Sequence, residues 1–217
     1  MPRSGETLSV NEVAAVVGMS PRAVNEIVDE AILPARFVVR RPRRAFMSPA
    51  CYLIAVYHGT SGRLTKPVSV RMVNLLSEAF GPLDAAAGRW QMPVPAHFLL
   101  REAFLTLDVR PFFEEVGRGG LRLDEARAMV TEDPDILGGM PVIAGTRIPV
   151  HDVAASARKN IPAERILRAY PALSPRHIEL AQVYADAHPP RGRPARVNTD
   201  WPDARRRSGS DVLRKAS

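Results

Sequence analysis

Two short helical patterns that meet at a glycine constrain the N-terminal part of this chain most strongly. Ser9 followed three residues later by Glu12 is the pattern of a capping box, and the valines after it repeat with helical spacing. Gly18 ends this first pattern. Ser20, with Pro21 at the next position, then begins a second amphipathic helix. We therefore predict two short helices that meet at a tight turn.

The same two helices carry the pattern of a helix-turn-helix motif. Ala14, Gly18, Val24 and Ile27 stand where that motif has a small packing residue, a turn glycine and two core hydrophobes. The start of the second helix is the part that enters a major groove in such motifs. Because arginine suits guanine and asparagine suits adenine, two of the outward-facing side chains there are candidate base readers. The candidate DNA-contacting residues of this helix are Ser20, Arg22 and Asn25.

A basic loop follows the two helices. Phe37–Val39 and Ala45–Met47 flank it as two predicted short strands, and Ser48-Pro49 opens a third helix that is expected to run to about Tyr57. The order helix, helix, basic hairpin, helix resembles the MerR-like winged helix-turn-helix, in which this loop would be the wing. Wing arginines mostly contact phosphates and so give affinity. The cluster contains no acidic residue and consists of Arg36, Arg40, Arg41, Arg43 and Arg44.

Two carboxylates favour an alternative interpretation of the helical pair. Glu26 and Asp29 lie on the outer face of the second helix, and carboxylates repel phosphate. The pair would then be an ordinary helical hairpin with a solvated polar face. Five arginines within nine residues directly downstream favour DNA binding over that alternative.

The middle of the chain has weaker signals. An amphipathic helix is predicted over 68–80, followed by a Gly-, Pro- and Ala-rich stretch over 81–98 that is typical of a domain boundary. Alternating residues predict a strand over 105–109. Helical patterns then cover 111–116 and 121–130, and the glycines between them are expected to break the helix.

A second constellation is dense in turn signals. From Asp133 to Val150 the chain reads DPDILGGMPVIAGTRIPV. Its glycines allow turn conformations and its prolines fix the chain direction, so we expect a tight hairpin with Pro141–Ile143 and Thr146–Ile148 as its arms. Three short helices are predicted after it, at about 151–159, 162–170 and 175–187.

This segment, with Tyr170-Pro171-Ala172-Leu173-Ser174 downstream, resembles the domain-of-unknown-function-433 family over about 131–187. With the N-terminal unit and the Arg191-Gly192-Arg193-Pro194 tail, the whole chain is similar to VapB-like antitoxins of type II toxin–antitoxin modules. The resemblance implies a compact, often dimeric, helix-turn-helix-like fold and therefore a homodimer. It also implies a partner toxin of the PIN-like ribonuclease class, and operator double-stranded DNA through which the antitoxin represses its own operon.

The last part of the chain, 189–217, has eight basic and three acidic residues and supplies five of the seven net positive charges. It offers little apolar surface, so we expect it to be disordered when alone. One interpretation is an AT-hook, in which Arg-Gly-Arg-Pro lies in a narrow A·T minor groove. The family resemblance favours the other, in which arginines pair with the metal-holding carboxylates of a nuclease. The candidate toxin-binding residues are Arg191, Arg193, Arg196 and Trp201.

Composition narrows the class of protein. Apolar residues make up 46% and charged residues 24% of the chain, as in soluble globular proteins, and the net charge of +7 favours an anionic partner. No apolar run reaches the length of a bilayer and no secretory signal is recognisable, so a cytoplasmic protein is expected. Cys51 is the single cysteine, and the five histidines show no metal-ligand spacing. We therefore expect no catalytic residues, no metal and no cofactor, and not an enzyme.

The predicted fold class is mainly α with short β hairpins. A winged helix-turn-helix is expected over 1–80, a connector with a short strand and helices over 81–130, a small helix-turn-helix-like domain with a β hairpin over 131–188, and a basic tail over 189–217. The predicted function is a DNA-binding antitoxin. The alternatives are a stand-alone MerR-like transcriptional regulator without a toxin, and a nucleic-acid-processing enzyme that would show metal-dependent cleavage.

Overall fold

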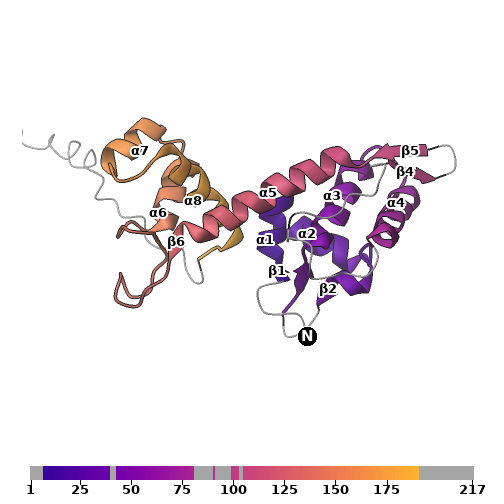
Figure 1. Cartoon of the computed structure of the whole chain (residues 1–217), viewed down its shortest axis with the longest axis horizontal. Coiled ribbons are helices and arrows are strands. Elements are labelled where there is room, and N and C mark those ends of the chain that lie inside the picture. The colour runs from indigo at the N-terminus through magenta and orange to yellow at the C-terminus, as the bar shows by residue number, and fades with distance from the viewer. Residues whose placement is uncertain (1–6, 40–42, 81–89, 91–98, 103–104, 191–217) are drawn as a thin grey trace, which may run out of the picture.

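The computed structural model describes residues 7–39, 43–80, 90, 99–102 and 105–190. This part of the chain is mainly helical, with short antiparallel strands. Figure 1 shows two groups of elements joined by one long helix, α5 (Arg110–Ala128). One group precedes α5 in the chain and the other follows it, so α5 contributes to both.

The capping residues predicted from the sequence begin the first two helices. The Ser9 side chain and the Glu12 backbone N–H form one half of a capping box, and the Glu12 side chain and the Ser9 N–H form the other. Gly18 has a φ of 68°, the left-handed turn that ends the first helix, and the Ser20 side chain accepts the Ala23 N–H. The elements before α5 are β1 (Thr7–Ser9), α1 (Val10–Val17), α2 (Pro21–Asp29), the 3₁₀ turn η1 (Ala35–Phe37), β2 (Val38–Val39), β3 (Ala45–Met47), α3 (Pro49–Ser61), α4 (Lys66–Ala79), β4 (Leu99–Glu102) and β5 (Leu105–Asp108).

The N-terminal group contains a small antiparallel sheet. Its strand order is β1-β3-β2, and Phe46 in the centre faces Leu8 on one side and Val38 on the other. The predicted hairpin of β2 and β3 is confirmed. The strand β1 was not predicted, because its three residues gain a partner only when a distant part of the chain folds beside them.

The third helix is longer than predicted and reaches Ser61 instead of ending near Tyr57. Gly59 lies in this added part of the helix. In the structure it allows the ring of Phe112 to approach, because a Cβ at position 59 would lie 2.3 Å from Phe112 Cε1. Tyr52 and Phe37 are among the largest fully buried side chains of the hydrophobic cluster that α1–α4 and the first part of α5 share.

The glycines at 117–120 do not break the helix, which corrects the prediction of two helices in this region. They permit close packing instead. A Cβ at position 119 would lie 2.2 Å from the carbonyl oxygen of Val16, and a Cβ at position 120 would lie 2.0 Å from the indole of Trp90. Glycine costs helix stability locally, but here it lets α5 lie directly against α1.

A second hydrophobic cluster lies beyond α5. Ile143, Val153, Ile166 and Tyr184 are among its buried members, and Ala126 joins it from α5. Asn160 has a φ of 56°, so a left-handed turn follows the first of the three helices. The elements are β6 (Val130–Thr131), β7 (Val142–Ile143), α6 (Val150–Arg158), α7 (Ala163–Ala169) and α8 (Pro175–Ala187).

The predicted hairpin at Ala144-Gly145 is only partly right. Ile143 N–H does donate to the carbonyl of Ile148 at 3.0 Å, as a tight turn requires. The strand β7, however, pairs with β6, so that Val142 faces Thr131 and Ile143 faces Val130. Residues 146–148 form no strand. The strand β6, which directly follows α5, therefore takes the place that the sequence pattern gave to the second arm.

Candidate nucleic-acid interface

The second helix presents its N-terminal half to solvent. Ser20 caps this helix, and the side chain of Arg22, in the first turn, is 90% exposed. Arg22 Nε lies 2.9 Å from a Glu26 carboxylate oxygen one turn further along. The apolar side of the helix, with Val24 and Ile27, is buried. The predicted candidate residues of α2 are thus on the outer surface of the fold.

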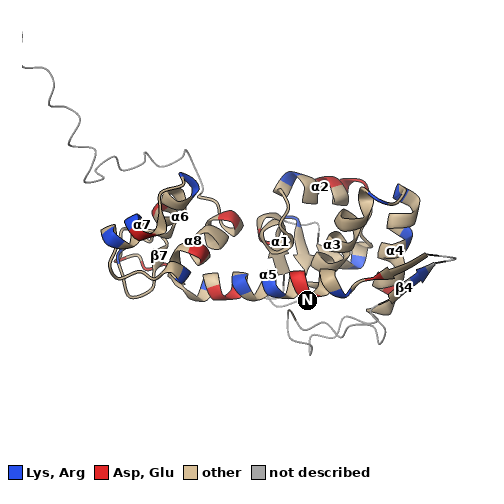
Figure 2. Ribbon diagram, turned by 90° about the horizontal axis from the view of Figure 1, so that it is seen from above, with Lys and Arg blue, Asp and Glu red and all other residues tan. Residues whose placement is uncertain are grey.

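The basic hairpin contacts α2 through Arg44. This side chain donates from Nη1 to the Asn25 amide oxygen at 2.5 Å and from Nη2 to an Asp29 carboxylate oxygen at 2.7 Å. Two residues predicted separately as DNA contacts, Asn25 and Arg44, are therefore partners in one hydrogen-bond network. Figure 2 shows the basic and acidic residues side by side along α2.

Not every arginine of the cluster belongs to the loop. Arg36 lies in η1, donates to the main-chain carbonyl of Ser77, and places its guanidinium 4.7 Å from the centre of the Phe37 ring. These contacts attach Arg36 to the α4 side of the core, so this member of the arginine cluster lies before β2 and outside the loop between β2 and β3. Arg43 is exposed shortly before β3.

Several predicted site residues lie outside the described part of the chain. Arg40 and Arg41 of the hairpin belong to this group. So do the four tail residues, whose proposed roles stay predictions: Arg191, Arg193, Arg196 and Trp201.

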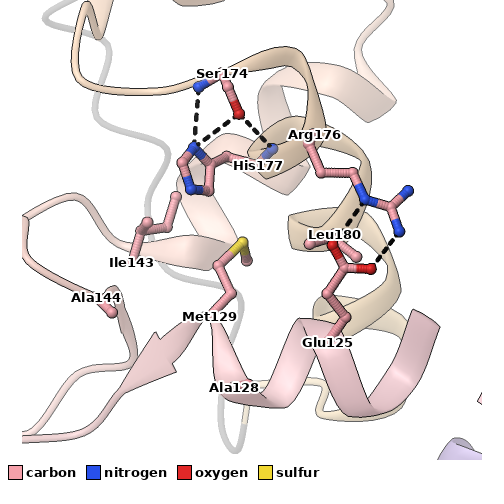
Figure 3. A pocket seen from close by; sticks show the side chains of 9 residues that line it. All are labelled: Glu125, Ala128, Met129, Ile143, Ala144, Ser174, Arg176, His177 and Leu180. Carbon is pink, nitrogen blue, oxygen red and sulfur yellow. Dashed lines mark hydrogen bonds and ion pairs between the residues drawn. The ribbon is translucent and has the colours of Figure 1, made fainter. Parts of the chain in front are cut away.

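A hollow of about 330 Å³ opens where α5 meets the C-terminal group. Figure 3 shows Met129 near its middle, with the Ser174–His177 capping contacts on one side and an ion pair of Arg176 and Glu125 on the other. Five of the nine lining residues are apolar. The lining consists of Glu125, Ala128, Met129, Ile143, Ala144, Ser174, Arg176, His177 and Leu180.

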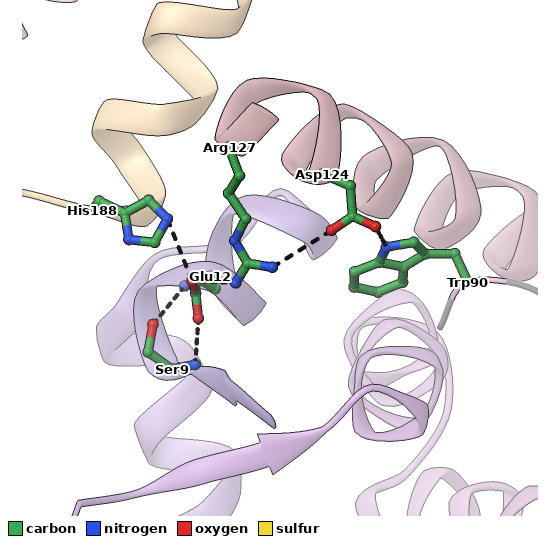
Figure 4. A network of polar contacts seen from close by, with 6 residues as sticks. All are labelled: Ser9, Glu12, Trp90, Asp124, Arg127 and His188. Carbon is green, nitrogen blue, oxygen red and sulfur yellow. Dashed lines mark hydrogen bonds and ion pairs between the residues drawn. The ribbon is translucent and has the colours of Figure 1, made fainter. Parts of the chain in front are cut away.

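A polar network joins α1, α5 and the end of α8 (Figure 4). Glu12, only 7% exposed, accepts the N–H of Ser9 at 2.7 Å, pairs with Arg127, and lies 3.4 Å from His188 Nε2. Arg127 also lies 3.5 Å from Asp124. Through Glu12, the cap of α1 is thus connected to both ends of the C-terminal group.

Two pKa values in this network are displaced from their usual range. Burial raises the pKa of Glu12, but the hydrogen bonds from Arg127 and the Ser9 N–H outweigh burial and leave the pKa below its ordinary value. Burial lowers the pKa of His188, and the Glu12 carboxylate offsets only part of that effect. Sequence reasoning found the capping role of Glu12 but not this network, whose members are distant in the chain.

Two other features are absent from the described residues. There, no three His, Cys, Asp or Glu side chains come together in a way that could hold a metal ion. None of the helices in those ranges is both long and apolar enough to cross a bilayer.

The family of proteins described as "Protein of unknown function (DUF433)" matches residues 130–185. Over 207 residues, 94% of this chain and 90% of the relative, the sequence is 41% identical to "Uncharacterized protein y4eO" of Sinorhizobium fredii (strain NBRC 101917 / NGR234). The chain belongs to the y4eO family. No solved structure matches it. Of the resemblances inferred from the sequence, the DUF433 domain is confirmed, at nearly the residues predicted, and the VapB-like and MerR-like resemblances stay predictions.

Proposed function

We propose that this y4eO-family protein is a DNA-binding antitoxin: its first 80 residues act as a winged helix-turn-helix on operator DNA, and its tail neutralises a PIN-like ribonuclease. The contact of Arg44 with Asn25 carries the DNA-binding half of the proposal. It holds the basic hairpin beside the exposed start of α2, the relative placement that groove reading by a helix and phosphate binding by a wing require.

The carboxylates on α2 bear directly on this proposal. Glu26 and Asp29 would repel phosphate if they stood alone, yet each is paired with an arginine, Arg22 and Arg44 respectively. An arginine has five N–H donors, so a guanidinium that holds one carboxylate keeps donors for a base edge or a phosphate. The ion pairs therefore lower the electrostatic cost of bringing α2 to DNA.

A binding assay on operator and random DNA tests this half. Replacing Arg22 or Asn25 by alanine is expected to cost about 1–3 kcal/mol on operator DNA and much less on random DNA. Replacing Arg41 and Arg43 together should weaken binding to both, and should flatten the dependence of log K on log salt by about 0.9 for each phosphate that is no longer neutralised. Arg63→Ala, at an exposed arginine in the α3–α4 turn, is the control. Equal weakening by this control would refute the assignment.

The toxin-neutralising half rests on the tail composition and on where the folded core ends. Ala187, at the end of α8, is still buried in the N-terminal hydrophobic cluster, whereas Pro189 and Pro190 are exposed. All eight basic residues of 189–217 thus follow the last core residue of the described ranges. Arginines in such a segment can form charge-assisted hydrogen bonds with the carboxylates of a metal-dependent nuclease.

Truncation after His188 tests this half separately. The truncated chain should keep its fold and most of its operator affinity, and should fail to inhibit RNA cleavage by the ribonuclease encoded beside it. The double variant Arg191→Ala/Arg193→Ala should reproduce this failure of inhibition in the full-length protein. If the truncation instead weakens binding to A·T-rich DNA and still inhibits the nuclease, the tail is an AT-hook and its assignment to the toxin is wrong.

A further inference from the structure

One large apolar side chain of α5 faces solvent. Leu121 is 63% exposed, the most exposed of the large hydrophobic residues in the described ranges. The exposed positions Arg118, Leu121, Glu125 and Ala128 are separated by three or four residues, so they form one stripe along the helix. A leucine at the centre of such a stripe exposes apolar surface that a partner could bury.

The hollow described above opens on the same stripe. Glu125 and Ala128 belong to both, and the other apolar lining residues, among them Met129 and Leu180, extend the hollow toward β7 and α8. At roughly 30 Å³ for a water-sized group, 330 Å³ is ample for the four carbon atoms of a leucine side chain. Leu121 and Ala128 are seven residues apart, which is about 10 Å along the helix.

We propose that two copies of this chain pair across a two-fold axis near Glu125, with Leu121 of each copy inserted into the hollow of the other. When a two-fold axis lies midway between a protruding side chain and a hollow on the same face, the side chain of each copy faces the hollow of the other. The two α5 helices then run antiparallel, and each Leu121 lies at the height of the partner's Ala128.

Charge favours a second copy as the occupant of the hollow. Glu125 in the stripe and Arg122 on its flank are both exposed, close to the proposed axis. In the antiparallel pair, Arg122 of one copy lies within about two residues of the height of Glu125 of the other, on both sides of the axis. Glu125 already pairs with Arg176, but a carboxylate has about four acceptor positions and can accept a second arginine. The face is thus complementary to itself in shape and in charge.

Sedimentation equilibrium on the full-length protein tests the pairing without DNA or toxin, so that its failure is separate from failure of the proposed function. Leu121→Asp should raise the dimer dissociation constant by about 100-fold or more, because two leucines are no longer buried and two carboxylates enter apolar hollows. Leu137→Asp is the matched control, since Leu137 is 46% exposed but lies in the loop before β7. A wild-type protein that stays monomeric at about 100 µM, a concentration well above the Kd of a stable dimer, or equal effects of the two variants, would overturn the proposal.

Cysteine cross-linking tests the register. Leu121→Cys and Ala128→Cys are made as two separate proteins, and the native Cys51 does not interfere because it is fully buried. Under mild oxidation, the mixture should form a disulfide-linked dimer, since only the unlike pair comes within the roughly 4.4–6.8 Å that disulfide Cα atoms need. Neither protein alone should cross-link, because like positions are about 10 Å apart along the axis. Cross-linking of Leu121→Cys to itself, or none in the mixture, would contradict this arrangement.

Discussion

Gly119→Ala tests whether helix propensity or close packing against α1 determines which residue is most stable at position 119. Alanine favours an α-helix over glycine by about 1 kcal/mol, so propensity alone predicts that the variant is more stable. The structure predicts the opposite. A Cβ at position 119 would lie 2.2 Å from the carbonyl oxygen of Val16, whereas ordinary van der Waals contact begins at 3.4 Å.

The loss of stability can be estimated from this distance, which is about 1.2 Å shorter than ordinary van der Waals contact. The neighbouring atom is main chain, so no side chain can rotate away and α5 must separate from α1. Overpacking a core costs about 1–3 kcal/mol, and a main-chain clash belongs at the upper end of that range. After the gain in propensity, the free energy of unfolding should fall by about 2 kcal/mol. For a chain of this size, that is a decrease in Tm of about 4–8 °C.

Thermal unfolding followed by circular dichroism measures this decrease. Gly117→Ala is the matched control in the same helix, because the nearest atom to its Cβ would be the Trp90 carbonyl oxygen at 3.8 Å. This control should raise the free energy of unfolding by about 1 kcal/mol and the Tm by about 2–4 °C. A Gly119→Ala protein at least as stable as wild type would refute the close-packing argument.

Two further predictions concern the polar network. Glu12→Gln should lower the free energy of unfolding by about 2 kcal/mol because Arg127 loses the more buried of its two carboxylate partners, and Arg127→Met in the same protein should recover part of that decrease in chemical denaturation. Burial places the pKa values of His188 and His151 below 6.5, so the unfolded chain binds protons more readily than the folded chain. Stability should therefore be complete above pH 6.5 and fall as the pH drops below it. Replacing both histidines by glutamine should remove most of the fall between about pH 7 and 5, and an unchanged pH profile would contradict this cause.

Local signals in the sequence predicted local structure well. The caps at Ser9 and Ser20 and the turn at Gly18 were found because a cap and its partner lie within four residues of each other. The DUF433 domain was found because its turn residues follow one another in a dense run. The predicted residues of α2 also lie on its exposed side, since the helical period fixes which residues share a face.

The errors came from residues whose partners are distant in the chain. The sequence alone does not distinguish a glycine that ends a helix from one that allows a neighbouring helix to approach. The role of Gly119 follows only from the position of Val16 in the fold. The pairing of Arg127 with Glu12 spans 115 residues and leaves no periodic signal. The contact of Arg44 with Asn25 was likewise invisible, although both residues were singled out.

Because α5 is one continuous helix, its length determines how the elements before it are oriented relative to the elements after it. One residue added between Leu123 and Ala126 would rotate everything downstream by about 100° and move it by about 1.5 Å. Seven added residues, close to two full turns, would nearly restore the original orientation at about 10 Å greater separation. In the y4eO family, insertions should therefore accumulate in loops such as the one before β7, whereas changes in this helix should come in steps close to whole turns.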